Sequence, residues 1–397
     1  MTHSPWQLPL APREVDIAIV GGGVIGCAAA YALREADPSL RLAIVEAGRL
    51  GAGASGRNAG FVLLGTPGAD PGSPDLQTRE RARRLWEFGR ENVRAIQDLD
   101  GSAFDLRWTG SLVAAGGDDE AMRLRRQSEV LDGVDWLEPD GLHGRLHARG
   151  FAGGVYVHEG GVLHPAKLVR HLAALSGATV LERMRVREIR RTGGEVILMG
   201  ETDKLRAGRV VLCLGAYLPQ LVPALASWVR PVRAQMFATE PLPPALDTPV
   251  YSHDGYFYLR QRADGRLLLG GARHLHRDEE VGYEDTTTPA LQSSLAQYLR
   301  DHFPGLAEAR PVRRWSGTMG FSPDGQPVVG EVPGLAGVIA ATGFTGHGMG
   351  VAVRFGQLLA RCVMDRPDPA LDLFTSSRIS EGAATSRQPA PFLLSHD

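Results

Sequence analysis

The chain has 397 residues, of which 43% are hydrophobic and 22% charged, so the sequence predicts a folded protein of two domains rather than one small binding module. With 43 basic and 45 acidic residues the formal net charge is −2, and no overall field attracts nucleic acid or anionic lipid. Three scattered cysteines, no signal-peptide pattern and no apolar stretch of membrane-spanning length predict a cytoplasmic protein without a membrane span.

The first predicted elements are a strand, a glycine turn, a helix and a second strand. Residues 15–20 form a β-branched run typical of a buried parallel strand, and residues 27–35 predict an alanine-rich helix. Residues 40–45 predict the second strand, which ends on Glu46. Between the first strand and the helix lies the sequence Gly21-Gly22-Gly23-Val24-Ile25-Gly26. This order is typical of a dinucleotide-binding unit.

Each position in this unit has a physical role at such a site. Gly21 allows a tight turn, Gly23 lets a pyrophosphate approach the backbone, and Gly26 lets the helix lie close to the strand. The helix N-terminus faces the phosphates. Glu46 is placed to accept hydrogen bonds from ribose hydroxyls, which disfavours the 2′-phosphate of NADP. NAD and FAD both satisfy this pattern, and a glycine turn without a ligand is the structural alternative.

The segment after Glu46 favours a flavin. Residues 48–60 are rich in glycine, serine and asparagine, and no helix is expected there. Such a segment offers backbone N–H groups and short polar side chains to a long ligand, as an extended flavin cofactor requires.

Further along the chain, residues 61–75 predict a loop that crosses between domains, and Asp75 is expected to cap a helix. Residues 251–271 predict a hairpin with an Asp-Gly turn. On its first strand, one face is expected to carry Tyr256, Tyr258 and Arg260. These are candidate substrate contacts; the alternative is two core tyrosines with Arg260 at the rim.

At this point the sequence resembles the D-amino-acid-oxidase-like family of FAD-dependent oxidoreductases, the group that contains glycine oxidase, sarcosine oxidase and γ-glutamylputrescine oxidase. The matching segments are DIAIVGGGVIG at 16–26, EAGRLGAGASGRNAG at 46–60, RVVLCLGA at 209–216 and GFTGHGMG at 343–350. A predicted helix follows the last of them, to residue 363. Together the segments extend over nearly the whole chain.

The resemblance implies an α/β fold with a Rossmann-like FAD-binding domain interleaved with an α+β substrate domain on a mostly antiparallel sheet. The FAD-binding domain would comprise residues 13–75, 150–216 and 320–366. The substrate domain would comprise residues 76–149 and 217–319. Residues 1–12 and 376–397 are expected to be flexible tails.

The resemblance also implies a reaction. A C–N bond in an amine or amino acid is oxidised to an imine, which hydrolyses, and molecular oxygen reoxidises the flavin and gives hydrogen peroxide. One alternative is a flavin dehydrogenase or electron-transfer subunit that oxidises an amino acid and passes electrons to a quinone or a partner protein. Another is an NAD-dependent dehydrogenase. The expected partners are small molecules, not nucleic acid, and a homo-oligomer is possible.

Every matching segment contributes to the expected FAD site. The turn with His347 would lie by the pyrimidine end of the flavin ring, although a histidine that only packs in a glycine turn is the alternative. Val186, in a strand predicted at 184–189, would contact adenine through its backbone. The flavin is expected to be non-covalent, since no cysteine lies near residues 319–323, where sarcosine oxidase attaches its flavin. The expected cofactor contacts are Gly21, Gly23, Val24, Ile25, Gly26, Glu46, Ala47, Ser55, Arg57, Asn58, Ala59, Gly60, Val186, Gly215, Gly343, Gly346, His347, Gly348 and Met349.

The chain departs from the family at the positions that usually hold a substrate carboxylate. Met319, Gly346 and Gly350 stand where relatives have arginine or lysine. A carboxylate in an apolar pocket without a cation is costly. The sequence therefore favours an amine without a carboxylate beside the reacting nitrogen. The alternative is an amino acid whose carboxylate is held by a relocated Arg260, Arg273 or Arg314.

The expected catalytic-site residues are His347, Tyr258, Arg260, Tyr256 and Met319. No metal site is expected: His274 and His276 can share one face of a strand, but no third ligand has suitable spacing, and a surface pair is the simpler interpretation.

Overall fold

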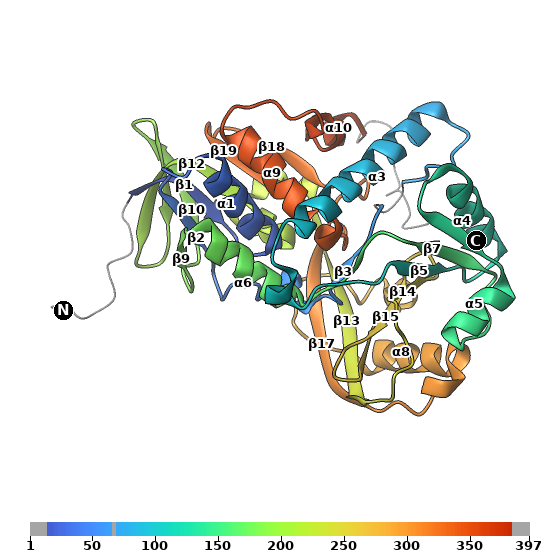
Figure 1. Ribbon diagram of the computed structural model, residues 1–397. Coiled ribbons are helices and arrows are strands. Elements are labelled where there is room, and N and C mark those ends of the chain that lie inside the picture. Colours follow the sequence, from blue (N-terminus) through green and yellow to red (C-terminus); the bar gives the residue numbers. More distant parts are fainter. Residues whose placement is uncertain (1–13, 66–68, 383–397) are drawn as a thin grey trace.

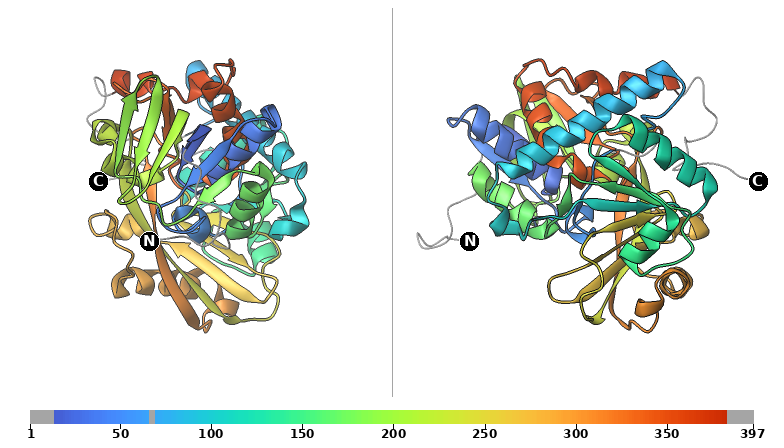
Figure 2. Two further views of the ribbon diagram at one scale, coloured as in Figure 1. Left: turned by 90° about the vertical axis from the view of Figure 1, so that its left-hand side faces the viewer. Right: turned by 45° about the vertical axis from the view of Figure 1, so that its right-hand side comes forward.

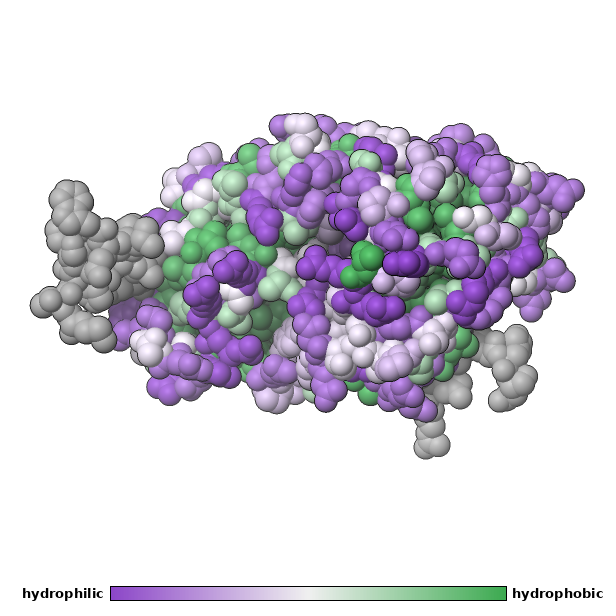
Figure 3. Space-filling view, turned by 90° about the horizontal axis from the view of Figure 1, so that it is seen from below, coloured by the Kyte–Doolittle hydropathy of each residue, from purple (hydrophilic) through white to green (hydrophobic). Residues whose placement is uncertain are grey.

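The computed structural model describes residues 14–65 and 69–382, and it has an α/β fold built on two large β-sheets (Figure 1). In that view the first sheet lies on the left and the second on the right. The long strands β13 and β17 of the second sheet extend toward the first, as the two further views also show (Figure 2). Seen from below, the molecule presents mostly polar residues with apolar residues gathered in limited patches (Figure 3).

The first sheet has a parallel centre. Strand β1 (Glu14–Val20) pairs in parallel with β2 (Leu42–Val45) on one side and with β12 (Lys204–Leu212) on the other. The β-branched run in β1 suits this position because Ala18 and Ile19 are fully buried between the layers on the two faces. The other strands of this sheet are β9 (Thr179–Leu181), β10 (Glu188–Thr192), β11 (Glu195–Met199), β18 (Val328–Glu331) and β19 (Val338–Thr342).

Four helices pack in one apolar cluster with the strands of this sheet: α1 (Val24–Ala36), α3 (Leu76–Gln97), α6 (Pro165–Ser176) and α9 (Ala352–Val363). Helices α1 and α9 lie close together, since a Cβ on Gly356 would stand 2.4 Å from the carbonyl carbon of Ala28. Asp75 caps α3 as predicted, because its side chain accepts a hydrogen bond from the N–H of Thr78.

The second sheet is mostly antiparallel, in the order β17-β13-β16-β15-β14-β5-β7-β6, with one parallel pair between β14 and β5. The predicted hairpin is confirmed, since β15 and β16 pair antiparallel around the Asp-Gly turn. The strands are β5 (Ser111–Ala114), β6 (Val134–Leu137), β7 (Gly154–Val157), β13 (Arg230–Pro241), β14 (Val250–Ser252), β15 (Phe257–Gln261), β16 (Arg266–Gly271) and β17 (Pro311–Phe321).

Shorter elements connect these layers. The remaining α-helices are α2 (Ala54–Arg57), α4 (Asp118–Val130), α5 (Pro139–Leu146), α7 (Leu218–Leu221), α8 (Pro289–His302) and α10 (Ser377–Gly382). A small sheet contains β3 (Phe61–Val62), β4 (Arg107–Trp108) and β8 (Gly161–Val162). The 3₁₀ turns are η1 (Gly101–Phe104), η2 (Gly215–Tyr217), η3 (Pro223–Trp228), η4 (Arg273–His276), η5 (Pro304–Leu306), η6 (Gly348–Gly350) and η7 (Leu371–Leu373).

Two elements pack with a different domain from the one predicted for them. Helix α3 was expected in the substrate domain, but its apolar side packs toward the first sheet, where the ring of Phe88 lies 6.2 Å from that of Phe355 in α9. Strand β7 was expected in the FAD-binding domain, but it pairs with β5 and β6 in the second sheet. The other boundaries stay predictions.

Several predicted elements near the cofactor segment differ in the structure. Helix α1 begins at Val24, not at residue 27, because the glycine turn already ends at Gly23. Strand β2 begins at Leu42, two residues later than predicted. Residues 54–57 form the short helix α2 where no helix was expected. Residues 184–187 are not a strand, and β10 begins only at Glu188.

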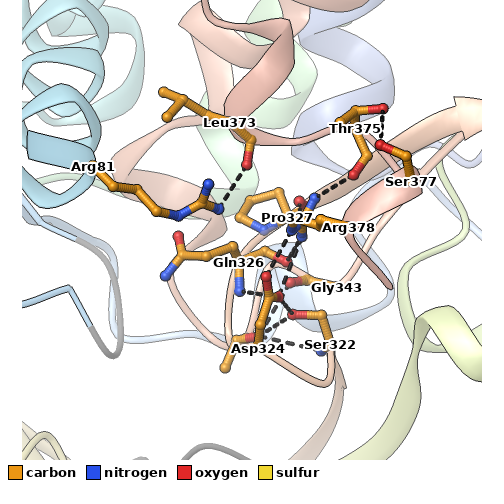
Figure 4. Close-up of polar contacts among 11 residues, drawn as sticks. Arg81, Ser322, Asp324, Gln326, Pro327, Gly343, Leu373, Thr375, Ser377 and Arg378 are labelled. Atoms are coloured by element: carbon orange, nitrogen blue, oxygen red, sulfur yellow. Dashed lines mark hydrogen bonds and ion pairs between the residues drawn. The ribbon is translucent and has the colours of Figure 1, made fainter. Parts of the chain in front are cut away.

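The C-terminal segment is ordered further than predicted, because residues 377–382 form α10. The guanidinium of Arg378 binds the carboxylate of Asp324 at 2.6 Å and donates to the carbonyl oxygens of Gln326, Pro327 and Thr375 at 2.9, 2.6 and 2.9 Å (Figure 4). These bonds tie α10 to the turn after β17. The rest of the predicted tails, residues 1–12 and 383–397, lies outside the described residues.

Candidate active site

A cavity of about 570 Å³ lies where the two sheets meet. The first sheet contributes the turn between β1 and α1, the end of β2 and the segments at 184–187 and 213–217. The second sheet contributes strands β13, β14, β15 and β17. The loop at 344–350 closes the cavity from a third side. The four segments that matched the family pattern therefore converge on one site.

The glycine turn forms a cradle at one end of this cavity. Gly21 has a φ of +115°, and a Cβ there would lie 2.3 Å from the carbonyl oxygen of Cys213. A Cβ on Gly26 would lie 2.0 Å from the carbonyl oxygen of Gly21, so the predicted close packing of helix and strand is confirmed. Gly23 is the N-cap of α1 and supplies no side-chain cap to the first N–H groups of this helix, whose N-terminus favours an anion. The N–H of Val24 binds Ser55 Oγ at 2.9 Å.

Glu46 lies at the end of β2, where the sequence predicts a ribose acid. Its carboxylate accepts hydrogen bonds from the backbone N–H groups of Gly22 and Gly48, at 2.8 and 2.7 Å. These bonds hold the carboxylate beside the glycine turn, and Glu46 and Ala47 both line the cavity. Val186 also lines it, from an extended segment rather than from the predicted strand.

The side chains of Arg57 and Asn58 shape the loop that carries them. Asn58 donates from its amide to the carbonyl oxygens of Ala54 and Ser55 and accepts from the N–H of Gly60. The Arg57 guanidinium forms a 2.7 Å ion pair with Asp285, so the charge of this arginine is already balanced by the protein. Both residues line the cavity, as do Ala59 and Gly215; Gly60 and Gly343 do not.

His347 lies in the loop at the centre of the cavity. Its Nδ1 stands 3.1 Å from the carbonyl oxygen of Thr345, which can only accept, so Nδ1 carries the proton and Nε2 bears the lone pair. Burial lowers the pKa of His347 to about 4. The imidazole is therefore neutral at pH 7. Because η6 intervenes, α9 begins only at Ala352, and His347 is not at the helix N-terminus where it was expected.

Two tyrosines face each other at the other end of the cavity. Tyr258 on β15 pairs in register with Tyr251 on β14, and their rings stack at 5.9 Å. Burial raises the pKa of Tyr251 to about 12 and also raises that of Tyr258, so both phenols stay protonated at physiological pH. Tyr251 was missed from the sequence. The sequence feature that could have identified Tyr251 is its position opposite Tyr258 on the paired strand.

Of the predicted group on one face, Tyr258 and Arg260 do share a face of β15, but the placement of Tyr256 with them is wrong. A turn with positive φ at His253, Asp254 and Gly255 precedes β15 and interrupts the alternation, so the Tyr256 ring packs against His274 at 4.3 Å and does not line the cavity.

Arg260 lies beyond the cavity and is buried. It donates to the carbonyl oxygens of Ala59, Gly60 and Leu163 at 3.0, 3.1 and 3.0 Å. Its position on the strand therefore brings it to the backbone of the cofactor loop, not to the substrate. Arg260 is a structural residue.

The other two arginines proposed for a carboxylate differ from each other. Arg314 is exposed on β17 and does not line the cavity. Arg273 does line it, and so does Met319. The sulfur of Met319 would lie 3.4 Å from a Cβ on Gly346, so this side chain fills space beside the glycine turn at 346–348.

His274 and His276 lie in the 3₁₀ turn η4, not on a strand. Within residues 14–65 and 69–382, no group of three or more His, Cys, Asp or Glu side chains has an arrangement that can hold a metal ion. In the same described part of the chain, none of the helices combines the length and apolar character needed to cross a membrane.

A parallel sheet, a glycine turn at a helix N-terminus and an acid at the end of the next strand define the class of dinucleotide-binding proteins. A sequence model described as FAD dependent oxidoreductase matches residues 16–362. The chain therefore belongs to this family of FAD-dependent oxidoreductases.

Among curated relatives, the probable oxidoreductase OrdL of Rhizobium meliloti (strain 1021) is 28% identical over 390 residues, which cover 94% of this chain and 88% of the relative. Glycine oxidase of Geobacillus kaustophilus (strain HTA426) is 29% identical over 374 residues, 91% of this chain and 96% of the relative. The solved structure of L-proline dehydrogenase from P. horikoshii has a TM-score of 0.79 at 20% identity, covering 94% of this chain and 99% of that chain, and shares the fold.

The cavity fits FAD. The glycine turn at the N-terminus of α1, which suits a pyrophosphate, and Glu46 at the end of β2 line the same cavity. Cys213 is the cysteine among the cavity-lining residues, and burial raises the pKa of its thiol far above the usual range. A thiol that does not ionise is a poor nucleophile. Non-covalent attachment of the cofactor stays a prediction.

Proposed function

We propose that this protein oxidises the C–N bond of an amine or amino acid, with molecular oxygen as the final electron acceptor. The observation that carries this proposal is the continuity of the cavity. The glycine cradle for FAD and the aromatic face of the second sheet line the same space of about 570 Å³. When bound, FAD supplies the two-electron acceptor that the protein itself lacks.

The proposed reaction balances. The carbon and nitrogen of the reacting bond lose two electrons and two protons, and a C=N bond forms. Oxygen takes up both electrons and both protons to give hydrogen peroxide. Water then hydrolyses the imine to a carbonyl compound and ammonia or an amine.

Apart from Arg273, the titratable residues around the substrate end stay neutral. His347 is an unprotonated imidazole with its lone pair on Nε2, and the phenols of Tyr251 and Tyr258 are protonated. Cavity-lining residues of the second sheet include no carboxylate among the residues described. The site therefore has no strong base, and the amine is expected to react in its neutral form, because a lone pair on nitrogen assists the loss of electrons.

The site residues have corresponding roles. His347 and Gly348 close the cavity over the cofactor, Met319 limits its depth, and Tyr258 positions the substrate. Gly21, Gly23, Val24 and Ser55 hold the pyrophosphate, and Glu46 holds the ribose. The remaining predicted contacts to the cofactor come from the backbone of the surrounding loops.

A substrate panel tests this function. Purified protein is assayed for peroxide release, and in parallel for reduction of an artificial dye, with primary amines, polyamines, N-methyl amino acids and D- and L-amino acids. Oxidation of at least one C–N substrate with peroxide formation is expected. Dye reduction without peroxide would show that the protein is a dehydrogenase rather than an oxidase. Absence of turnover with every compound of the panel would reject the proposed function.

A further inference from the structure

Arg273 enters the cavity from a turn at the end of the second sheet. Strand β16 ends at Gly271, and Ala272 has a φ of +58°, a conformation that non-glycine residues rarely adopt. The backbone leaves the sheet at this point, and Arg273 begins η4. Arg273 lines the cavity, whereas Arg260 on β15 and Arg314 on β17 do not.

Two aromatic rings contact this guanidinium. Its carbon lies 4.9 Å from the centre of the Tyr256 ring and 4.7 Å from the centre of the Phe321 ring. Both distances are those of a cation–π contact, so the two rings hold the guanidinium in place. A planar fork of N–H donors matches the two oxygens of a carboxylate.

The charge of Arg273 is distinctive on this side of the cavity. The residues that the described second sheet contributes there are otherwise uncharged: Ala234, Met236, Tyr251, Gly255, Tyr258 and residues 315 and 317–321. Arg57, a cation in the cofactor loop, is paired with Asp285. An anion that enters this end of the cavity is therefore attracted to Arg273, and the surrounding apolar side chains strengthen the attraction by keeping water away.

The position of this charge also suits a substrate. Burial is the main cause of the lowered pKa of His347, and the charge of Arg273 lowers that pKa further. The same charge acts on the phenols of Tyr251 and Tyr258. Arg273 and these three groups line the same cavity, in which the Tyr251 ring lies 5.9 Å from that of Tyr258 and 6.0 Å from that of His347.

We propose that Arg273 is the specificity-determining anchor for a carboxylate of the substrate, and that the substrate is an amino acid. This inference rests on the proposed oxidation of a C–N bond. It explains how the cavity can accept a carboxylate although Met319, Gly346 and Gly350 are neutral, because the cation approaches from β16 instead. It also reverses the preference for a carboxylate-free amine that the sequence alone suggests.

Binding of simple carboxylates tests the anchor without turnover. The oxidised holoenzyme is titrated with benzoate and with the neutral benzamide, and binding is followed through the visible absorption of the flavin. Wild type is expected to bind benzoate more tightly than benzamide. Arg273→Met is expected to weaken benzoate binding by about 30-fold or more and to leave benzamide binding unchanged. Equal affinity of wild type for both probes would overturn the proposal.

Two further variants make the result specific. Arg273→Lys keeps the charge but not the planar fork and is expected to bind benzoate with intermediate affinity. Arg314→Met removes an exposed arginine on β17 outside the cavity and is expected to bind as wild type does. Retention of FAD by each variant is measured first. A loss of benzoate binding in Arg314→Met equal to that in Arg273→Met would contradict an anchor at Arg273.

Turnover then identifies the substrate. Each α-, β- and ω-amino acid is compared with the amine that lacks its carboxylate, such as alanine with ethylamine. Wild type is expected to have the higher kcat/KM for amino acids, and Arg273→Met is expected to lose this preference. A wild-type preference for the amines would overturn the anchor but leave C–N oxidation intact. Carboxylate binding without turnover of any pair would leave the anchor standing and reject the proposed function.

Discussion

The two ends of the cavity are built in different ways. At the cofactor end, backbone atoms form the surface, and the decisive residues lie close together in sequence: Gly21, Gly23 and Gly26 in one turn and Glu46 at the end of the next strand. At the substrate end, side chains form the surface, and they come from strands far apart in sequence, such as Met236 on β13, Tyr258 on β15 and Met319 on β17. Local pattern therefore defines the cofactor end, whereas tertiary packing defines the substrate end.

The largest expected effect is at the cofactor end. Gly21→Ala places a Cβ 2.3 Å from a backbone carbonyl oxygen at a φ of +115°, which we expect to cost about 3 kcal/mol and to remove bound FAD. The FAD content per chain after desalting and the Tm check this. The matched control is Gly141→Ala in α5, where an added Cβ meets nothing within 4 Å. If Gly21→Ala retains stoichiometric FAD, the backbone is not the surface that holds the cofactor.

Arg260→Met is expected to have the next largest effect, and it tests whether Arg260 stabilises the fold or binds the substrate. It leaves the carbonyl oxygens of Ala59, Gly60 and Leu163 without this donor, so we expect a loss of about 3 kcal/mol in the free energy of unfolding with little change in KM. Arg262→Met, an exposed residue on the same hairpin, is the control. A raised KM at an unchanged Tm would instead show that Arg260 contributes to substrate binding.

The ion pair between Arg378 and Asp324 tests how much the C-terminal helix α10 gains from its contact with the turn after β17 (Figure 4). Arg378→Ala is expected to lower the free energy of unfolding by about 2 kcal/mol, and exposed Arg366→Ala to leave it unchanged. Although burial raises the pKa of Asp324, the hydrogen bonds from Arg378 lower it overall.

This ion pair also has a defined pH dependence. A lowered folded-state pKa stabilises the protein above the unfolded pKa of about 3.9, and the stabilisation is lost as pH falls through the folded value. The Tm difference between wild type and Arg378→Ala should therefore be larger at pH 6 than in strong acid, where only the bonds of Arg378 to carbonyl oxygens remain. A constant difference across this range would show that the carboxylate of Asp324 does not contribute.

The smallest expected effect concerns His347. Because burial lowers its pKa to about 4, His347 does not titrate between pH 5 and 9, and kcat/KM should rise with pH only as the substrate amine loses its proton. His347→Gln is expected to keep this profile. An inflection near pH 6.5 in wild type that disappears in His347→Gln would show that the imidazole titrates in the free enzyme.

The sequence predicted the cofactor end well because its constraints are local. Position 21 requires a glycine because a Cβ there would meet the backbone of Cys213, and position 26 requires one because a Cβ there would meet the backbone of Gly21. A strand pattern precedes these glycines and a helix pattern follows them. It failed at Tyr256 because the turn at residues 253–255 interrupts the alternation of the strand. It also could not separate Arg260 from Arg273, because the packing of β15 and β16 decides which guanidinium reaches the cavity.

One measurement tests both ends of the cavity: the anaerobic bleaching of the flavin absorption after the holoenzyme is mixed with an amino acid or with its decarboxylated amine. This observation depends on C–N oxidation but not on the final electron acceptor. We predict bleaching by amino acids in wild type, and much slower bleaching by the amines and by Arg273→Met with amino acids. Absence of bleaching by every amine and amino acid in a protein that retains FAD would contradict the account.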